Sequence, residues 1–339
     1  MVTLSAADAI SPAVQRTRDF LFRPFRFGTY LKLCLVALLT EGIGNFQSSH
    51  HGGHTSNRVF GAASPSPFTP AEVAGIVAAA LLATALAFIV FYLITRLRFA
   101  YFHCLVHNVR QIRPGWSIYR AQAMRFFGMN LVVGVCFLCL VLLAVLPFAA
   151  GLWAVVRGVG HGGRPEFGAI LALALPLIPI IVLVVIAAIA VDVILRDFML
   201  PHYALENATA GGAWRAVRLR IRAEKGPFLR YTLVRVFLPI VAIIGLGILF
   251  ILPAILFAAM TAVIEFGIHS AVTGMAGIVL EVFVGATAFC VLAVVAISVG
   301  GPVNTAIREY ALMFYGGRFP ALGDILAPPI APAGAPGLV

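Results

Sequence analysis

Four histidines in this sequence are candidates for binding a metal ion. His50, His51 and His54 lie within five residues of one another, and His161 follows in a later polar stretch. Together with Glu41, which is expected on the same outer side of a membrane, their imidazole nitrogens suit zinc or a similar divalent ion. Against this, the tract around the first three is rich in Gly, Ser and Pro, and no His-Glu-x-x-His helix occurs.

Two acidic residues fall within or beside apolar stretches. Glu281 lies about six residues into the last of them, and an acid at that depth in a membrane is costly and points to a function. It could bind a proton or a cation, or it could face the helix bundle or reach the outer membrane surface. Asp192 has Arg196 four residues on, so the two side chains can pair on one helix face.

Basic and aromatic residues alternate in two of the polar connections. On a helix, Trp214, Val217 and Ile221 share one face, and arginines occupy the adjoining face. This pattern is typical of an amphipathic helix that lies on a membrane surface, although the arginines could also serve only to set the topology. The residues expected to contact lipid headgroups are Arg98, Trp116, Arg120, Arg196, Trp214, Arg215, Arg218 and Arg222.

The composition shows where these side chains must sit. Of 339 residues, 61% are hydrophobic and only 11% are charged, and the mean hydropathy is +1.02. Water-soluble domains have about 25% charged residues, so the sequence excludes an ordinary soluble fold. It predicts an all-α, polytopic membrane bundle.

A helix needs roughly 20 mostly apolar residues to cross a bilayer, and six apolar runs qualify as spans. They are Phe27–Ile43, Glu72–Thr95, Gly128–Val156, Gly168–Leu195, Val236–Ile264 and Met275–Gly301. We therefore expect a basic amphipathic segment over 1–26 and a six-helix transmembrane domain over 27–301. The remainder, 302–339, is expected to be a terminal segment that is disordered from about residue 316.

The basic residues predict the orientation. Of 24 Lys and Arg, 21 fall on one side of these six spans, and only Arg58, Arg157 and Arg164 fall on the other. By the positive-inside rule the first side is cytoplasmic, which places both termini in the cytoplasm and the protein in the inner membrane. The net charge of +11 then indicates contact with anionic lipids and not with nucleic acid.

An internal repeat is suggested by three matches at one offset. Arg98, Trp116 and Arg120 recur 98 residues later as Arg196, Trp214 and Arg218. The N-terminal and C-terminal segments resemble parts of the same unit, so we expect parallel helical-hairpin repeats that are linked by amphipathic helices on the cytoplasmic surface.

The layout also resembles a known family. A six-span, basic-linked chain that opens with Ala13-Val14-Gln15-Arg16 and continues with Phe22-Arg23-Pro24-Phe25 is similar to the membrane domain fused to glycerophosphoryl diester phosphodiesterases and to its uncharacterised inner-membrane relatives. The His-Arg-Gly sequence of the catalytic domain is missing. The resemblance therefore implies the membrane part alone, without enzymatic activity.

These features favour a non-enzymatic membrane protein, with no cofactor, that organises lipids or a partner protein, for example one of lipid metabolism. A permease or lipid transporter that uses Glu281 as its coupling acid is an alternative. A metal-dependent membrane hydrolase that uses the outer histidines is the third. The sequence does not indicate an oligomeric state.

Overall fold

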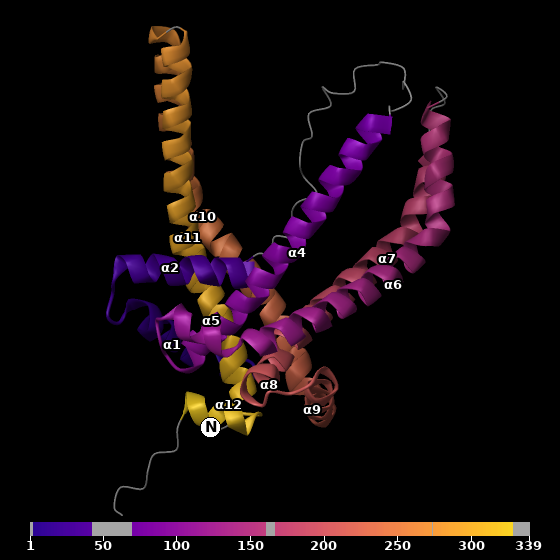
Figure 1. Cartoon of the computed structure of the whole chain (residues 1–339), viewed down its shortest axis with the longest axis vertical. Helices are drawn as coiled ribbons and strands as arrows, with labels where there is room; N and C mark the ends of the chain where they lie inside the picture. Colours follow the sequence, from indigo (N-terminus) through magenta and orange to yellow (C-terminus); the bar gives the residue numbers. More distant parts are fainter. Residues whose placement is uncertain (1–2, 43–69, 161–166, 273, 328–339) are drawn as a thin grey trace, which may run out of the picture. The chain divides into compact units, whose positions relative to one another are not determined.

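The computed structural model describes residues 3–42, 70–160, 167–272 and 274–327, and every regular element in these ranges is helical (Figure 1). In chain order the elements are α1 (Ile10–Phe22), α2 (Phe27–Ala37), the π-helix η1 (Leu38–Gly42), α4 (Pro70–Val106), α5 (Ile112–Ile118), α6 (Arg120–Gly160), α7 (Phe167–Val193), the π-helix η2 (Ile194–Met199), α8 (Leu200–Leu205), α9 (Ala210–Ala223), α10 (Lys225–Ala271), α11 (Met275–Gly316) and α12 (Pro320–Leu326). The chain divides into two compact units, unit 1 (1–119 and 225–339) and unit 2 (120–224).

Five helices of the described ranges are long and apolar enough to cross a membrane. They cover Val73–Val106, Arg120–Phe148, Leu175–Leu205, Lys225–Ala271 and Met275–Gly316. The sequence prediction of an all-helical membrane protein is therefore confirmed. A helix satisfies all its backbone hydrogen bonds internally, which is what a chain surrounded by lipid requires.

The first apolar run does not form a comparable helix. The described part of Phe27–Ile43 folds as α2, of eleven residues, followed by the five residues of η1. Sixteen residues are fewer than the roughly 20 that a span needs, so six spans are not confirmed.

Helix α2 lies across α11 and not alongside it (Figure 1). The Tyr30 hydroxyl donates a hydrogen bond of 2.7 Å to the carbonyl of Ser298, and the Leu38 side chain lies against Gly300. Eight residues of helix therefore separate two contacts that are only two residues apart on α11. At 1.5 Å of rise per residue, the two contacts are about 12 Å apart along the first helical segment but only about 3 Å apart along α11. The two helices therefore cross.

The end of η1 lies level with the last third of α4. The Arg98 Nε of α4 donates a hydrogen bond of 3.0 Å to the carbonyl of Thr40. Helix α4 begins at Pro70, 28 residues and about 42 Å of helix before Arg98. Thr40 therefore lies about 42 Å along α4 from the start of that helix.

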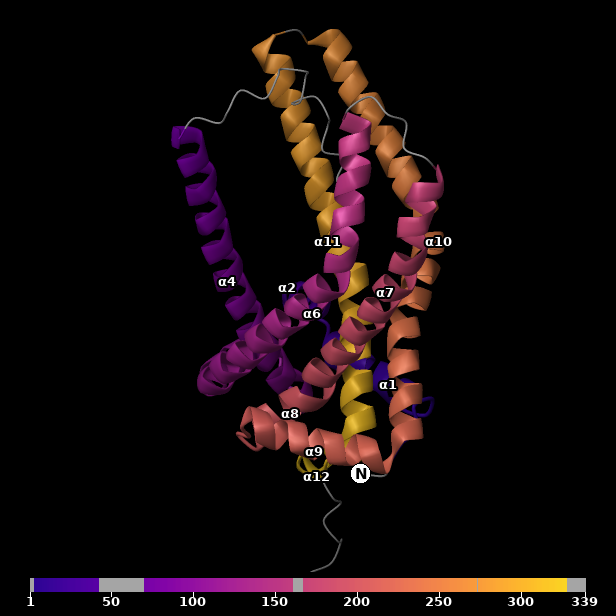
Figure 2. The same ribbon diagram turned by 90° about the vertical axis from the view of Figure 1, so that its right-hand side faces the viewer.

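The second half of α11 forms the core of unit 1. Its residues from Asn304 to Gly316 are nearly all buried, and their rings pack on the start of α10. The Tyr231 ring stacks on Tyr310 with centroids 5.1 Å apart and on Phe314 with centroids 4.4 Å apart. Helices α10 and α11 lie side by side in both views (Figures 1 and 2).

The structure differs from one part of the prediction for the terminal segment. Helix α11 continues past residue 301 without a break, and its buried residues belong to unit 1. The expected disorder from about residue 316 does not occur over α12, where Leu322 is fully buried. Aromatic packing gives this stretch a core that its Ala, Pro and Gly content does not suggest.

Unit 2 consists of the α6–α7 hairpin, whose helices lie side by side in both views, and the short elements η2, α8 and α9 (Figures 1 and 2). Tyr203 of α8 joins the short elements to α6. Its ring meets the edge of Phe126 at a centroid distance of 5.2 Å, and its hydroxyl lies 3.1 Å from the sulfur of Met129.

One of the three repeat matches occupies similar local positions. Trp116 and Trp214 are each the fifth residue of their helix and each follows a buried small residue. Outside the three matches, Asn108 and Asn207, which lie two residues after the ends of the preceding helices, both have left-handed backbones, with φ of 55° and 52°. The third match differs, because Arg120 begins α6 whereas Arg218 lies inside α9. The threefold repeat stays a prediction.

Candidate functional site

The basic side chains of α9 are the largest exposed set among the predicted lipid-contacting residues. The hydroxyl of Thr209 accepts a hydrogen bond of 3.3 Å from the Gly212 amide and so caps the start of this helix. Arg215, Arg218 and Arg222 are all exposed along its length. Their spacing of three and four residues puts them on one side of the helix.

The apolar residues of α9 are divided between two directions. Val217 is fully buried, and so is Ala213 one turn earlier. These two residues fasten α9 to the protein, whereas the sequence suggested that Val217 faces lipid. Trp214, which is 44% exposed, and Leu219 point outward instead. The exposed face of α9 therefore combines one indole ring with three guanidinium groups.

Arg220 of the same helix points inward. Its guanidinium lies 3.3 Å from His202 Nε2, and the other ring nitrogen of His202 lies 2.7 Å from a Glu206 carboxylate oxygen. This chain of polar contacts holds α9 against α8. The exposed arginines are consequently presented by a helix that is fixed on its opposite side.

Three other predicted residues make contacts within the protein. Arg196 is 3% exposed and pairs with Asp192 at 3.0 Å, as the spacing of four residues predicted. Arg98 donates to Thr40, as described above, and Trp116 is covered by the Arg96 guanidinium, 4.4 Å from the centre of its ring. Arg120, in contrast, is exposed.

A buried ionic cluster in unit 1 was not anticipated. A Glu41 carboxylate oxygen lies 3.5 Å from Arg235 of α10, and the other lies 3.9 Å from Arg308 of α11. The charge count assigns both arginines to the side opposite Glu41, so the contact shows that the predicted sides of Glu41 and of these arginines cannot both hold. The only sequence signal was an acid at the end of a short apolar run.

A second buried pair joins α1 to α11. Arg16 Nε lies 3.2 Å from the carboxylate of Glu309, whose side chain is completely buried. The same guanidinium donates to the carbonyls of Leu105 and Val106, at 2.8 and 3.2 Å, and to that of Leu326 at 3.3 Å. A cation at the C-terminal end of α4 also interacts favourably with the helix dipole.

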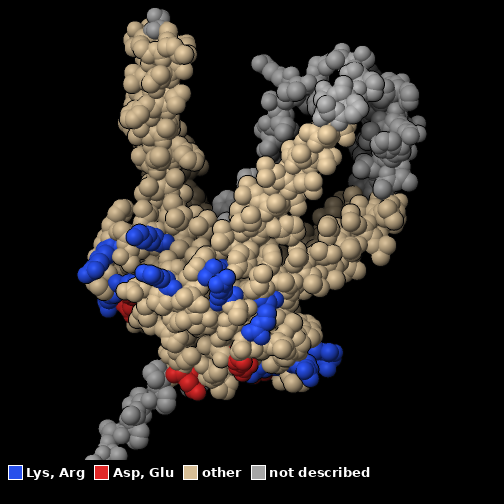
Figure 3. Space-filling model, viewed as in Figure 1, with Lys and Arg blue, Asp and Glu red and all other residues tan. Residues whose placement is uncertain are grey.

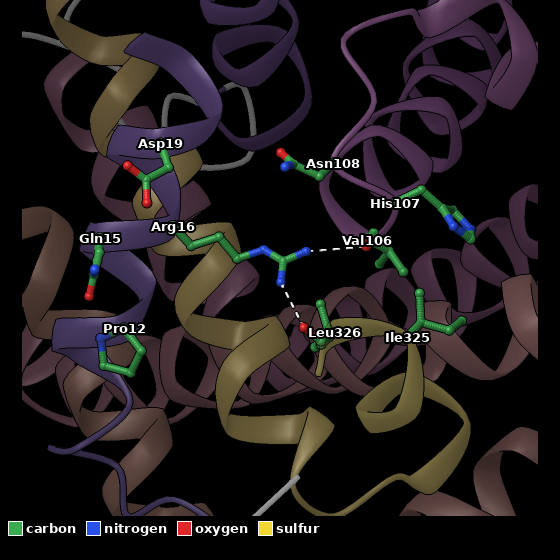
Figure 4. Close-up of a pocket in the computed structure, with 9 residues that line it drawn as sticks. All are labelled: Pro12, Gln15, Arg16, Asp19, Val106, His107, Asn108, Ile325 and Leu326. Carbon is green, nitrogen blue, oxygen red and sulfur yellow. Dashed lines mark hydrogen bonds between the residues drawn. The ribbon is translucent and has the colours of Figure 1, made fainter. Parts of the chain in front are cut away.

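A polar cavity of about 510 Å³ lies beside this arginine (Figure 4). Gln15 and Asp19 of α1 line one side, His107 and Asn108 the other, and the end of α12 closes it. The Arg16 guanidinium reaches across the cavity and already donates its hydrogen bonds to the carbonyl oxygens described above. The cavity therefore contains both charge signs and favours no single ligand.

Glu281 does not stand alone near the start of α11. A carboxylate oxygen lies 3.0 Å from His269 Nδ1 on α10, and the His269 side chain is 81% exposed. Both residues line a cavity of about 540 Å³ with Glu265. Within the described ranges no three His, Cys, Asp or Glu side chains are placed to hold a metal ion, and His50, His51, His54 and His161 lie outside those ranges.

Charged side chains gather near the ends of the long helices. On the face shown in Figure 3, the upper part of the α10–α11 hairpin carries no Lys or Arg, whereas several lie around its base. This division agrees with a membrane position for the hairpin, because charged side chains are costly in hydrocarbon.

Comparison with known proteins gives one match. A family model described as a family of unknown function (DUF7544) matches residues 4–325 and so covers both units. No curated protein and no solved structure matches the chain. The resemblance to the phosphodiesterase membrane domain therefore stays a prediction.

Proposed function

The chain belongs to DUF7544, a family of unknown function, and we propose that it is a non-enzymatic integral membrane protein that binds anionic phospholipid headgroups on one side of the membrane. A single observation carries the proposal. Helix α9 exposes Arg215, Arg218 and Arg222 beside the exposed ring of Trp214, while its opposite side is buried.

The chemistry of these side chains fits a phosphate-rich surface. A guanidinium group donates two parallel hydrogen bonds to phosphate oxygens, and it is held less tightly by water than an ammonium group. Indole rings favour the boundary between headgroups and acyl chains. A basic residue near an anionic leaflet contributes about 1 kcal/mol to binding, so the three arginines together supply roughly 3 kcal/mol.

We assign α9 to the cytoplasmic leaflet of an inner membrane because of the charge distribution. The sequence divides the basic residues 21 to 3 between the two sides, and arginines are retained on the cytoplasmic side during insertion. Both termini then lie in the cytoplasm. By resemblance to the phosphodiesterase membrane domain, lipids collected at this surface could be presented to a separate partner protein.

The test compares lipid retention by the intact chain and by an α9 variant. The full chain is reconstituted into nanodiscs that contain phosphatidylglycerol and phosphatidylcholine. The lipids that stay bound after the protein is released are counted by native mass spectrometry. The wild type should retain phosphatidylglycerol selectively. The triple variant R215A/R218A/R222A should bind it about 100-fold more weakly, because roughly 3 kcal/mol is removed.

A matched control removes the same net charge elsewhere. The variant R58A/R157A/R164A alters the three arginines that the sequence predicts for the opposite side, and it should retain phosphatidylglycerol as the wild type does. Equal losses in both variants would mean that only net charge matters. Undiminished binding by the α9 variant would contradict the proposal.

A further inference from the structure

The corner between α1 and α2 exposes three large aromatic rings. Phe22 is 42% exposed, Phe25 is 54% exposed and Phe27 is 58% exposed. Water-soluble surfaces rarely carry such a cluster, and contiguous exposed apolar groups mark interaction surfaces. These rings are not part of the α9 surface.

Two of these rings pack on Tyr30 and on each other. The Phe22 and Phe25 rings lie 5.4 and 5.5 Å from the Tyr30 ring, and they stack on each other at 6.2 Å. Arg110 holds the turn itself, because its guanidinium donates to the carbonyls of Arg23 and of Pro24, the latter at 2.7 Å. The corner is therefore held in place by the Tyr30 ring of α2 and by Arg110 from the connection between α4 and α5.

Contacts with α11 give the depth of this cluster in the membrane. Tyr30 is bonded to Ser298, and the residues 282–297 before it are uncharged. Glu281 precedes Ser298 by 17 residues, or about 26 Å of helix, which is close to the roughly 30 Å of a hydrocarbon core. The uncharged stretch continues to Ile307, so Ser298 lies in its second half, toward the end of α11 that carries Arg308, and α2 crosses the helix there.

Exposed cations lie on the same segment as the rings. Arg23, Arg26 and Lys32 are all exposed. A surface that combines aromatic rings with basic side chains is complementary to an anionic leaflet, where the rings enter the boundary region and the cations meet phosphates.

We propose that residues 22–35 are an interfacial membrane anchor that lies in the plane of the leaflet and is not a membrane span. Its occupant is the anionic phospholipid leaflet in which the protein is embedded. Phe22, Phe25 and Phe27 enter the boundary between headgroups and acyl chains. Arg26 and Lys32 bind headgroup phosphates. The proposal does not depend on lipid binding by α9.

The test measures the depth of a single tryptophan. In the full chain the three tryptophans are replaced by Phe and F25W is added, and the protein is placed in phosphatidylglycerol bilayers. Lipids brominated near the headgroup should quench this tryptophan more strongly than lipids brominated near the acyl-chain ends, and its emission should be shifted to the blue.

The matched control is V14W in the same background. Val14 is also an exposed apolar residue, but α1 meets α11 at Glu309 through Arg16, 11 residues and about 16 Å of helix beyond Ser298. Its tryptophan should emit as in water and escape the brominated lipids. Water-like emission from F25W would overturn the proposal and favour a protein partner, and strongest quenching from the acyl-chain ends would restore a transmembrane segment.

A second measurement keeps the native tryptophans. The variant R26A/K32A should bind phosphatidylglycerol about 30-fold more weakly in native mass spectrometry, at about fivefold for each basic residue. The variant R26K/K32R, which keeps both charges, should bind it as the wild type does. Unchanged binding by R26A/K32A would overturn the role of these cations, whatever the result for α9.

Discussion

The carboxylate of Glu41 lies 3.5 Å from the guanidinium of Arg235, although 193 residues of chain separate them. Arg308 completes the cluster at 3.9 Å from the other oxygen. All three side chains are buried, so the end of η1 is joined by charge to α10 and α11. This contact holds the first apolar segment at the arginine-rich ends of those helices.

Neutralising Glu41 should destabilise unit 1 strongly. The substitution E41Q leaves Arg235 and Arg308 buried near one another without the carboxylate, and the loss of one partner of a buried pair costs about 3–5 kcal/mol. Thermal unfolding of the purified protein in detergent should show a clearly lower midpoint. D324N, at an exposed acid of the same unit, should leave the midpoint unchanged, and an equal effect of both changes would contradict the role of the cluster.

Replacing Arg16 should release α1 from the rest of unit 1. A lysine cannot reproduce the fork that reaches Glu309 and the carbonyls at the end of α4, so even R16K should loosen the helix. Hydrogen exchange should become faster over α1 and the end of α4. The control R18K changes an exposed arginine of the same helix and should have no such effect; equal exchange in the two variants would argue against this contact.

A side chain at position 301 should separate α2 from α11. A Cβ on Gly301 would collide with both the backbone and the side chain of Cys34, so G301A should shift α2, and the midpoint of thermal unfolding should fall. G247A is the matched control, because nothing lies within 4 Å of a Cβ there. Because alanine is favoured over glycine inside a helix, G247A should stabilise the protein by about 0.5–1 kcal/mol. A loss of stability in G247A as large as that in G301A would show that close packing at residue 301 is not the cause.

Removing the charge of Glu281 should have little effect on stability. Its partner His269 is largely exposed, and exposed ion pairs contribute about 0–1 kcal/mol. The midpoint of thermal unfolding of E281Q should therefore be close to that of the wild type and well above that of E41Q in the same assay. A large loss of stability would mean that Glu281 is buried in the membrane and that its environment differs from the one described.

The sequence determined the class of the protein and five of the six spans that it predicted, because the length and apolarity of a helix are local properties that lipid selects directly. It also predicted the pairing of Asp192 with Arg196, which is set by helix periodicity. Only the tertiary structure decided that Phe27–Ile43 does not form a long helix and that Glu41 faces Arg235. It alone also showed that Arg196 and Val217 are turned into the protein while Trp214 and three arginines of α9 are not. The physical reason is that each of these outcomes depends on a partner far away along the chain, or on which side of a helix is covered, and neither is encoded in the hydropathy of the segment itself.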